Sequence, residues 1–334
     1  MKLTFTRSHF LSAGITPFTT LVVATATAKA AQFQYKWATV TPADYSANIR
    51  SSQICDAVKN ETNGRLELTL FPNGALGNAA SLLEQLRLGS IQFFTGSAFS
   101  SIVPSFQITN LGFAYKSSKQ ALDAMDRRVG AYIRKELAAK GIYAFDRSWD
   151  DGFRQITSSV KPIRAASDLV GFKVRTQPSP IIIELFNTLG ASAVPLDANQ
   201  LYTGLQTHIV DGQESALPYI DATKLYEVQR YVSITNHVFT NGWLAANGDA
   251  WNALPSDIQE SVKRNVTKFV LAQRRDAALL DASSGDNLRK HGLIFNTADT
   301  ASMRAQLGSY YARWKSELGA DIWRLLEASV GRLG

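Results

Sequence analysis

Apolar and polar positions alternate between two periods along the chain, which predicts an α/β protein. Residues 33–40, 65–71 and 91–94 have the short apolar or alternating pattern of strands. Residues 46–62 and 79–88, which lie between them, have the spacing of amphipathic helices. This order of strands and helices predicts parallel strands with helices on the faces of the sheet.

A second unit of this kind follows around Arg175. An apolar strand ends at residues 174–176, residues 181–189 have the pattern of an apolar helix closed by Gly190, and residues 191–195 form another short strand. Arg175 therefore stands at the carboxyl end of its strand, the edge of an open α/β sheet where ligands bind. A buried arginine at that edge requires an anionic partner.

Two segments are predicted to cross between the halves of the chain, at residues 152–158 and 231–238. A long helix follows at residues 256–280, with Ser256 as its N-cap. Double crossing predicts two lobes that hinge over a cleft. We expect lobe I to comprise residues 31–151 and 240–280, and lobe II to comprise residues 152–239 and 281–334.

The first thirty residues have the features of a secretory signal peptide. Lys2 and Arg7 precede an apolar and small-residue stretch, and Ala28, Lys29 and Ala30 fit the A-x-A cleavage pattern. A membrane anchor is the alternative, but five threonines and a proline within the stretch weaken a spanning helix. The pattern predicts export to the periplasm with cleavage near Ala30.

The charge of the chain argues against a nucleic-acid partner. Its 35 basic and 28 acidic residues give a net charge of +7. Without Lys2, Arg7 and Lys29 the mature chain keeps 32 basic residues and a net charge of +4. Basic residues are interspersed with acidic ones, as on a solvated surface. The small positive excess favours anionic solutes.

Cysteine and histidine usage predicts neither a disulfide nor a metal or other cofactor. Cys55 is the only cysteine in the sequence and is interpreted as a buried structural residue. His208, His237 and His291 have no second histidine or cysteine at the spacing of metal ligands.

A secreted hydrolase is a competing interpretation. Asp211 and Glu214 are three residues apart, and Asp150 and Asp151 are adjacent, so a pair of catalytic carboxylates is conceivable. Acidic residues are too common for this spacing to be informative. The sequence has no G-x-S-x-G, zinc or P-loop motif, and we do not expect an enzyme.

Short motifs occur in a fixed order from about Trp37 to Pro255. They lie at residues 64–68, 71–77, 86–91, 152–157, 168–175, 202–206, 210–214 and 251–255. In this order they resemble the periplasmic solute-binding proteins of tripartite ATP-independent (TRAP) transporters. The resemblance implies a two-lobed, periplasmic-binding-protein-like α/β fold, in which each lobe is a mostly parallel sheet flanked by helices and a long helix spans both lobes. It also implies a receptor, expected to be a monomer, that binds an organic acid and delivers it to TRAP membrane permease subunits.

The resemblance maps Arg154 and Arg175 onto positions that contact the ligand carboxylate. The planar fork of a guanidinium donates two parallel hydrogen bonds to a carboxylate. Without the resemblance, a lone arginine is more readily interpreted as part of a surface ion pair.

Ser215 departs from part of the family. Sialic-acid-type and many sugar-acid-type members have asparagine after the Asp-Gly-Gln-Glu motif, where this chain has Ser215. A hydroxyl reaches less far than an amide, which favours a shorter or more apolar acid over a polyhydroxylated one. The alternative is that Ser215 caps the next turn. Gly212, within the motif, is interpreted as a turn residue with positive φ.

Aromatic residues near these positions are candidates for the walls of the pocket. Trp149 lies in an apparent loop and is placed in the cleft, and Tyr219 and Phe239 are further candidates. Core packing is the alternative for each of them.

Two other binding interpretations remain open. One is an ABC-type periplasmic receptor, although the order of motifs and the long helix favour the TRAP type. The other is a receptor that presents its solute to a membrane sensor instead of a permease.

Overall fold

A computed structural model describes residues 31–333. The predicted signal peptide and its cleavage site near Ala30 lie outside the described residues. Among the helices of the described part, none has the length and apolar character needed to cross a membrane.

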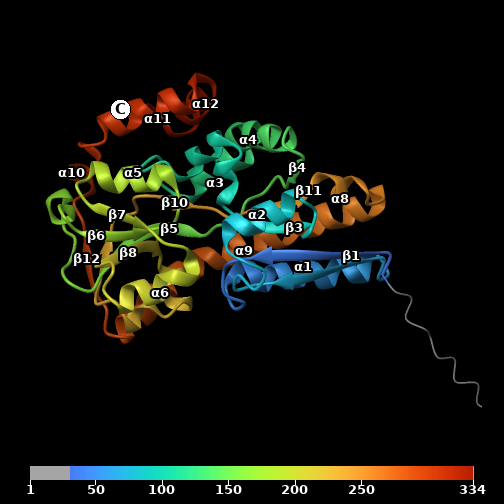
Figure 1. Cartoon of the computed structure of the whole chain (residues 1–334), viewed down its shortest axis with the longest axis horizontal. Helices are drawn as coiled ribbons and strands as arrows, with labels where there is room; N and C mark the ends of the chain where they lie inside the picture. The colour runs from blue at the N-terminus through green and yellow to red at the C-terminus, as the bar shows by residue number, and fades with distance from the viewer. Residues whose placement is uncertain (1–30, 334) are drawn as a thin grey trace, which may run out of the picture. The chain divides into compact units, whose positions relative to one another are not determined.

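The first sheet has β3 at its centre, with β1 and β11 on either side (Figure 1). Its strands, in spatial order, are β2 (Leu66–Phe71), β1 (Phe33–Thr39), β3 (Phe93–Gly96), β11 (Trp243–Asn247) and β4 (Ile142–Ala144). The helices α1 (Ser46–Glu61) and α2 (Ala79–Arg87) connect β1 to β2 and β2 to β3, so these strands are parallel as expected. Trp37 and Phe93 are buried in the core beneath the sheet.

The second sheet contains the strand that carries Arg175. Its spatial order is β12 (Ile294–Thr297), β9 (Tyr231–Ile234), β5 (Gly152–Ser158), β8 (Gly212–Ala216), β6 (Lys173–Thr176) and β7 (Ser192–Pro195), and β10 (Phe239–Thr240) also pairs with β5. Its flanking helices include α5 (Pro180–Thr188), α6 (Ala198–Gln206) and α7 (Leu217–Ala222).

Both sheets are mostly parallel, as expected, and each contains one strand that runs against the others. β11 runs antiparallel to β3 and β4, and β5 runs antiparallel to β8, β9 and β10. β5 and β11 are the strands by which the chain enters one sheet after leaving the other. Because no helical crossover within the sheet precedes them, nothing constrains them to be parallel.

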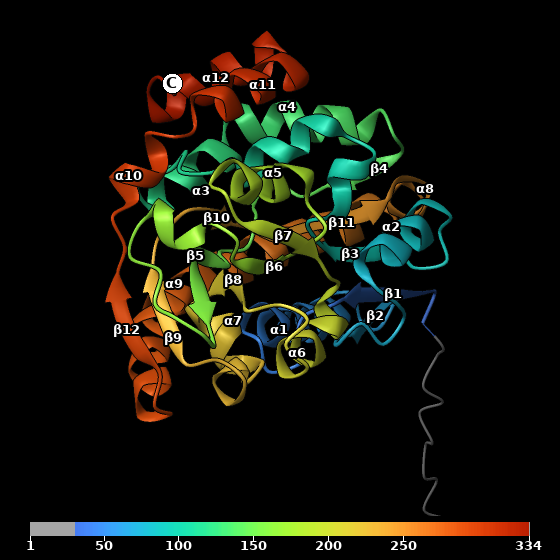
Figure 2. The same ribbon diagram turned by 60° about the vertical axis from the view of Figure 1, so that its left-hand side comes forward.

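The long helix α9 (Ser256–Lys290) has 35 residues and continues ten residues beyond the predicted end. Val262 and Val266 pack in the core of the first sheet with Trp37. Leu288, near its other end, packs with Leu217 beside the second sheet. The helix therefore reaches both cores, and Figure 2 shows it running between α1 and β12.

Several predicted helices are divided or extended in the structure. The helix expected at residues 120–140 is α3 (Ser118–Asp126) and α4 (Arg128–Ala138), separated by the non-helical Arg127. The helix expected at residues 300–318 is α10 (Thr300–Arg304) and α11 (Gly308–Leu318). The remaining helices are α8 (Gly248–Asn252), α12 (Ala320–Val330), and the 3-10 segments Ala98–Ser101, Pro104–Asn110, Ala166–Leu169 and Leu225–Glu227.

The carboxyl-terminal helices contact elements that lie before and after β5 in the chain. α11 packs against α5, and α12 packs against α3 and α4. The boundaries that we assigned to the two lobes stay a prediction.

Gly212 has a different role from the one expected. It lies within β8, and its φ is not positive. A Cβ at this position would lie 2.0 Å from the Thr157 carbonyl oxygen and 2.6 Å from the Phe172 ring. Glycine is required because the neighbouring strand approaches closely.

Candidate functional site

A cavity of about 680 Å³ lies where strands of both sheets end. From the first sheet it is lined by residues that follow β1, β2 and β3, among them Thr41, Asn73 and Ser97. From the second sheet it is lined by Arg154, Arg175 and residues that follow β6 and β7. The carboxyl ends of parallel strands are the edge at which α/β sheets bind ligands.

Three helices begin at this cavity. Ala79, Pro180 and Ala198 are the first residues of α2, α5 and α6, and all three line it. The N-terminus of a helix carries partial positive charge and unpaired N–H groups, so it favours an anion. The helix N-termini of the cavity therefore favour an anionic ligand, as its arginines do.

Arg175 is a buried cation in the wall of the cavity. Its side chain is 3% exposed, and its Nε and Nη2 donate to the Leu196 carbonyl oxygen at 2.9 and 2.6 Å. Burial lowers its pKa to about 10, so the guanidinium stays charged at neutral pH. Among the described residues, no carboxylate forms an ion pair with it within 4.0 Å. A buried charge without a counterion is unfavourable, and an anionic ligand would provide the missing charge.

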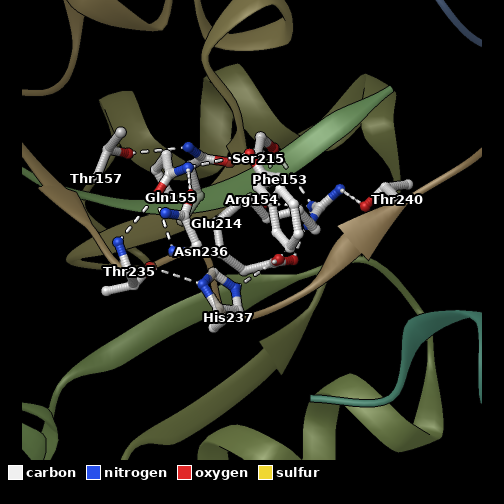
Figure 3. Close-up of polar contacts among 11 residues, drawn as sticks. Phe153, Arg154, Gln155, Thr157, Glu214, Ser215, Thr235, Asn236, His237 and Thr240 are labelled. Carbon is white, nitrogen blue, oxygen red and sulfur yellow. Dashed lines mark hydrogen bonds and ion pairs between the residues drawn. The ribbon is translucent and has the colours of Figure 1, made fainter. Parts of the chain in front are cut away.

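Arg154, on β5, has a counterion within the protein (Figure 3). Its Nε and Nη2 contact the Glu214 carboxylate, with Nη2 at 2.8 Å from Oε1, and its Nη1 donates to Thr240 Oγ1 at 3.3 Å. Glu214 is fully buried. Arg154 therefore lines the cavity with its charge largely compensated, and Arg175 is the stronger candidate for an anion anchor.

A histidine contacts the carboxylate of the Arg154 and Glu214 ion pair. His237 Nε2 lies 3.3 Å from Glu214 Oε2, and His237 Nδ1 lies 2.7 Å from the Thr235 hydroxyl. Burial lowers the pKa of His237 more than the Glu214 charge raises it, which favours the neutral imidazole. Burial alone would raise the pKa of Glu214, but the charge of Arg154 and the hydrogen bonds from His237 and Arg154 lower it to about 2.

Ser215 and Tyr219 also lie in the cavity lining. The Ser215 hydroxyl is 2.6 Å from Gln213 Oε1 and 2.7 Å from the Glu214 carbonyl oxygen, and it does not cap α7. Tyr219 is half-buried and packs edge-on against Tyr45, with ring centroids 6.2 Å apart. Both residues therefore line the cavity, and their roles in ligand binding stay predictions.

Trp149 and Phe239 are not in the lining, which corrects their placement in the pocket. Trp149 is fully buried in the core of the first sheet, and its backbone N–H donates to the Gly242 carbonyl oxygen at 2.8 Å. Phe239 packs against the rings of Phe153 and Tyr115. Alternation along a strand turns Phe239 into the core and Thr240 toward the cavity.

Sequence reasoning missed several residues of the lining, notably Tyr45, Gln107, Asp151 and Thr240. Asp151 was considered only as half of a catalytic carboxylate pair. Its position three residues before Arg154, next to a crossing strand, was the available signal. Burial, followed by the neighbouring Asp150, raises its pKa to about 7.

Residues 37–317 match the family model described as bacterial extracellular solute-binding protein, family 7. The chain belongs to this family. It is 28% identical over 312 residues to the 2,3-diketo-L-gulonate-binding periplasmic protein YiaO of Escherichia coli, a match that covers 92% of this chain and 93% of YiaO.

Solved structures agree with this membership. The sugar acid binding protein DctPAm from Advenella mimigardefordensis, in complex with galactonate, has a TM-score of 0.86 and 26% identity, covering 90% of this chain and 99% of its own. A TRAP periplasmic solute-binding protein from Sulfitobacter with bound β-D-galacturonate has a TM-score of 0.85 and 26% identity, covering 89% and 99%.

The predicted TRAP family and two-lobed α/β class are thereby confirmed. A family 7 protein is a solute receptor and not an enzyme, so neither the hydrolase nor the ABC-type interpretation is favoured. YiaO and the Sulfitobacter protein are periplasmic.

Proposed function

We propose that this family 7 protein binds an organic acid in the cavity, with the ligand carboxylate on Arg175, and delivers it to a TRAP membrane permease. The observation that carries the proposal is the buried Arg175 guanidinium, which lines the cavity without a protein counterion. Two of its N–H groups bond Leu196, which holds the side chain in one orientation. Its Nη1 takes part in none of the hydrogen bonds among the described residues and is available for a ligand oxygen.

We propose first that the protein acts in the periplasm, after export and cleavage near Ala30. We propose second that it acts as a monomer. The periplasmic location of its relatives supports the first point. Size-exclusion chromatography with light scattering on the mature chain tests the second.

A ligand screen tests the proposal directly. The mature chain is unfolded thermally in the presence of organic acids and of neutral sugars as a control, and any copurified ligand is released for mass spectrometry. A ligand present at about 100 times its Kd should add roughly 2.7 kcal/mol of stability. Stabilisation by neutral sugars alone, or chemical turnover of a bound acid, would refute the proposal.

Ligand binding is expected to bring the two sheets together. Both sheets contribute walls, and the Asn78 side chain at the start of α2 already donates to Asp197 at the start of α6, at 2.9 Å. Hinge closure of this kind reduces the radius of gyration. Small-angle scattering with and without saturating ligand measures it, and identical profiles would indicate a rigid pocket.

A further inference from the structure

Asp151 is a carboxylate in the cavity wall at the junction between the two sheets. Its backbone N–H donates to the Thr240 carbonyl oxygen at 3.1 Å, so the two connecting segments hold it in place. Its Oδ2 faces Gly242, where a Cβ would be only 3.2 Å away. The lack of a side chain at residue 242 leaves room for the carboxylate.

The other acidic side chains around the cavity have assigned partners. Glu214 is paired with Arg154, Asp197 accepts from Asn78, and Asp150 accepts from the Gly152 N–H at 3.0 Å. Asp151 forms no ion pair within 4.0 Å among the described residues, and its side-chain hydrogen-bond partner is the Tyr45 hydroxyl, which also lines the cavity. The Arg154 charge lowers the pKa of Asp151, but the ion-pair partner of Arg154 is Glu214 and not Asp151.

We propose that Asp151 determines specificity: it accepts a hydrogen bond from a hydroxyl of the ligand and disfavours a second carboxylate. This inference rests on the proposed function, because it places the first carboxylate on Arg175. The ligand class is then a hydroxylated monocarboxylate. A second carboxylate in place of the hydroxyl would meet a like charge, which is unfavourable in a site shielded from water.

The rest of the lining supports hydroxyl groups along the ligand. It includes the amide side chains of Gln107, Gln177 and Asn199. An amide both donates and accepts, as a hydroxyl does, whereas an ammonium only donates. The short hydroxyl of Ser215 was the reason to expect a more apolar acid. The amide side chains of the lining favour a hydroxylated acid instead.

Protonation of Asp151 should change the ligand preference with pH. Its pKa is raised to about 7 by burial and by Asp150, against the opposing effects of Tyr45 and Arg154. Above that pH it is ionised and repels a second carboxylate. Below it, the neutral acid donates a hydrogen bond, so discrimination against dicarboxylates should decrease as the pH falls.

Calorimetry on matched ligands tests the inference. Six-carbon aldonates are each compared with the aldarate of the same configuration and with the aldonate whose terminal hydroxyl is replaced by an ammonium. At pH 8 the wild type should bind its best aldonate about tenfold or more tightly than the matched aldarate, which corresponds to one charge-assisted hydrogen bond. The preference should be smaller at pH 5.5.

Asp151→Asn should reduce this preference at pH 8 by about tenfold, because its amide also donates to a carboxylate. It should also remove the dependence of the preference on pH. Asp150→Asn is the matched control: it changes the adjacent carboxyl outside the lining and should keep the preference for the aldonate. Circular dichroism and thermal unfolding verify that both variants are folded.

The outcomes separate the two proposals. An unchanged ratio in Asp151→Asn, tighter binding of aldarates or of the ammonium analogue, or binding only of unhydroxylated acids would refute the role of Asp151 and leave the proposed function standing. Failure of every organic acid to bind would refute both.

Discussion

Replacing Arg175 with alanine is expected to weaken binding of the cognate acid by about a hundredfold or more. A carboxylate on a guanidinium accepts charge-assisted hydrogen bonds worth about 1.5 to 3 kcal/mol each, and about 1.4 kcal/mol corresponds to tenfold in Kd. Arg175→Lys keeps a charge but loses the fork, so affinity should fall by about tenfold to a hundredfold. Isothermal titration calorimetry with the acid found in the screen measures both.

Lys173→Ala is the matched control for Arg175. Lys173 lies on the same strand, β6, but its side chain is exposed. Removing it should leave affinity close to that of the wild type. The far-UV circular dichroism of Arg175→Ala should match the wild type, because the lost side chain faces the cavity. Wild-type affinity in both Arg175 variants would show that the anchor is elsewhere.

Glu214→Gln is expected to reduce the free energy of unfolding by about 3 to 5 kcal/mol, the usual cost of removing one partner of a buried ion pair. Arg154 would then carry an uncompensated charge in a site where it is only 7% exposed. Chemical denaturation of the unliganded protein measures the change. The exposed pair of Glu84 and Arg87 offers a control, since Glu84→Gln should cost less than about 1 kcal/mol.

The double variant Arg154→Met, Glu214→Gln tests the reason for this loss. If the cost comes from an uncompensated charge, removing Arg154 as well should recover part of the lost stability. Additive losses in the double variant would instead indicate that each residue contributes independently through packing.

Stability should also depend on pH through Glu214. Its pKa is lowered to about 2 in the folded protein, against about 4.3 in an unfolded chain. The stabilisation is therefore fully present above about pH 4.3 and is lost as the pH falls toward the folded value. Thermal unfolding between pH 6 and pH 3 should show this loss in the wild type and a smaller one in Glu214→Gln. Equal slopes would contradict the assignment.

Local periodicity was sufficient to predict most strands and helices of this fold. The directions of β5 and β11 were not predictable in the same way, because they depend on where the chain enters a sheet from outside it. The break at Arg127 was also missed. A Cβ on Gly130 would lie 1.6 Å from the Met125 carbonyl oxygen. The predicted helix is therefore divided where the backbone of Met125 lies very close to Gly130, a contact that the hydrophobic periodicity does not indicate.

The candidate site was predicted in part. Arg154, Arg175, Ser215 and Tyr219 line the cavity, and their roles in binding stay predictions. The buried ion pair was missed because Arg154 and Glu214 are 60 residues apart and meet only when β5 pairs with β8. Trp149 was predicted in the cleft because it lies beside Asp150 and Asp151 in an apparent loop, but the local sequence does not show that its side chain packs in the core.

The stretch of α9 between its two cores has a mechanical consequence. Residues 278–283 are exposed on every side of the helix, so their backbone hydrogen bonds have no side-chain packing to protect them. If one core moves relative to the other, we expect the helix to bend within this segment first. The amide protons of residues 278–283 should therefore exchange with solvent faster than those around Val262 or Leu288.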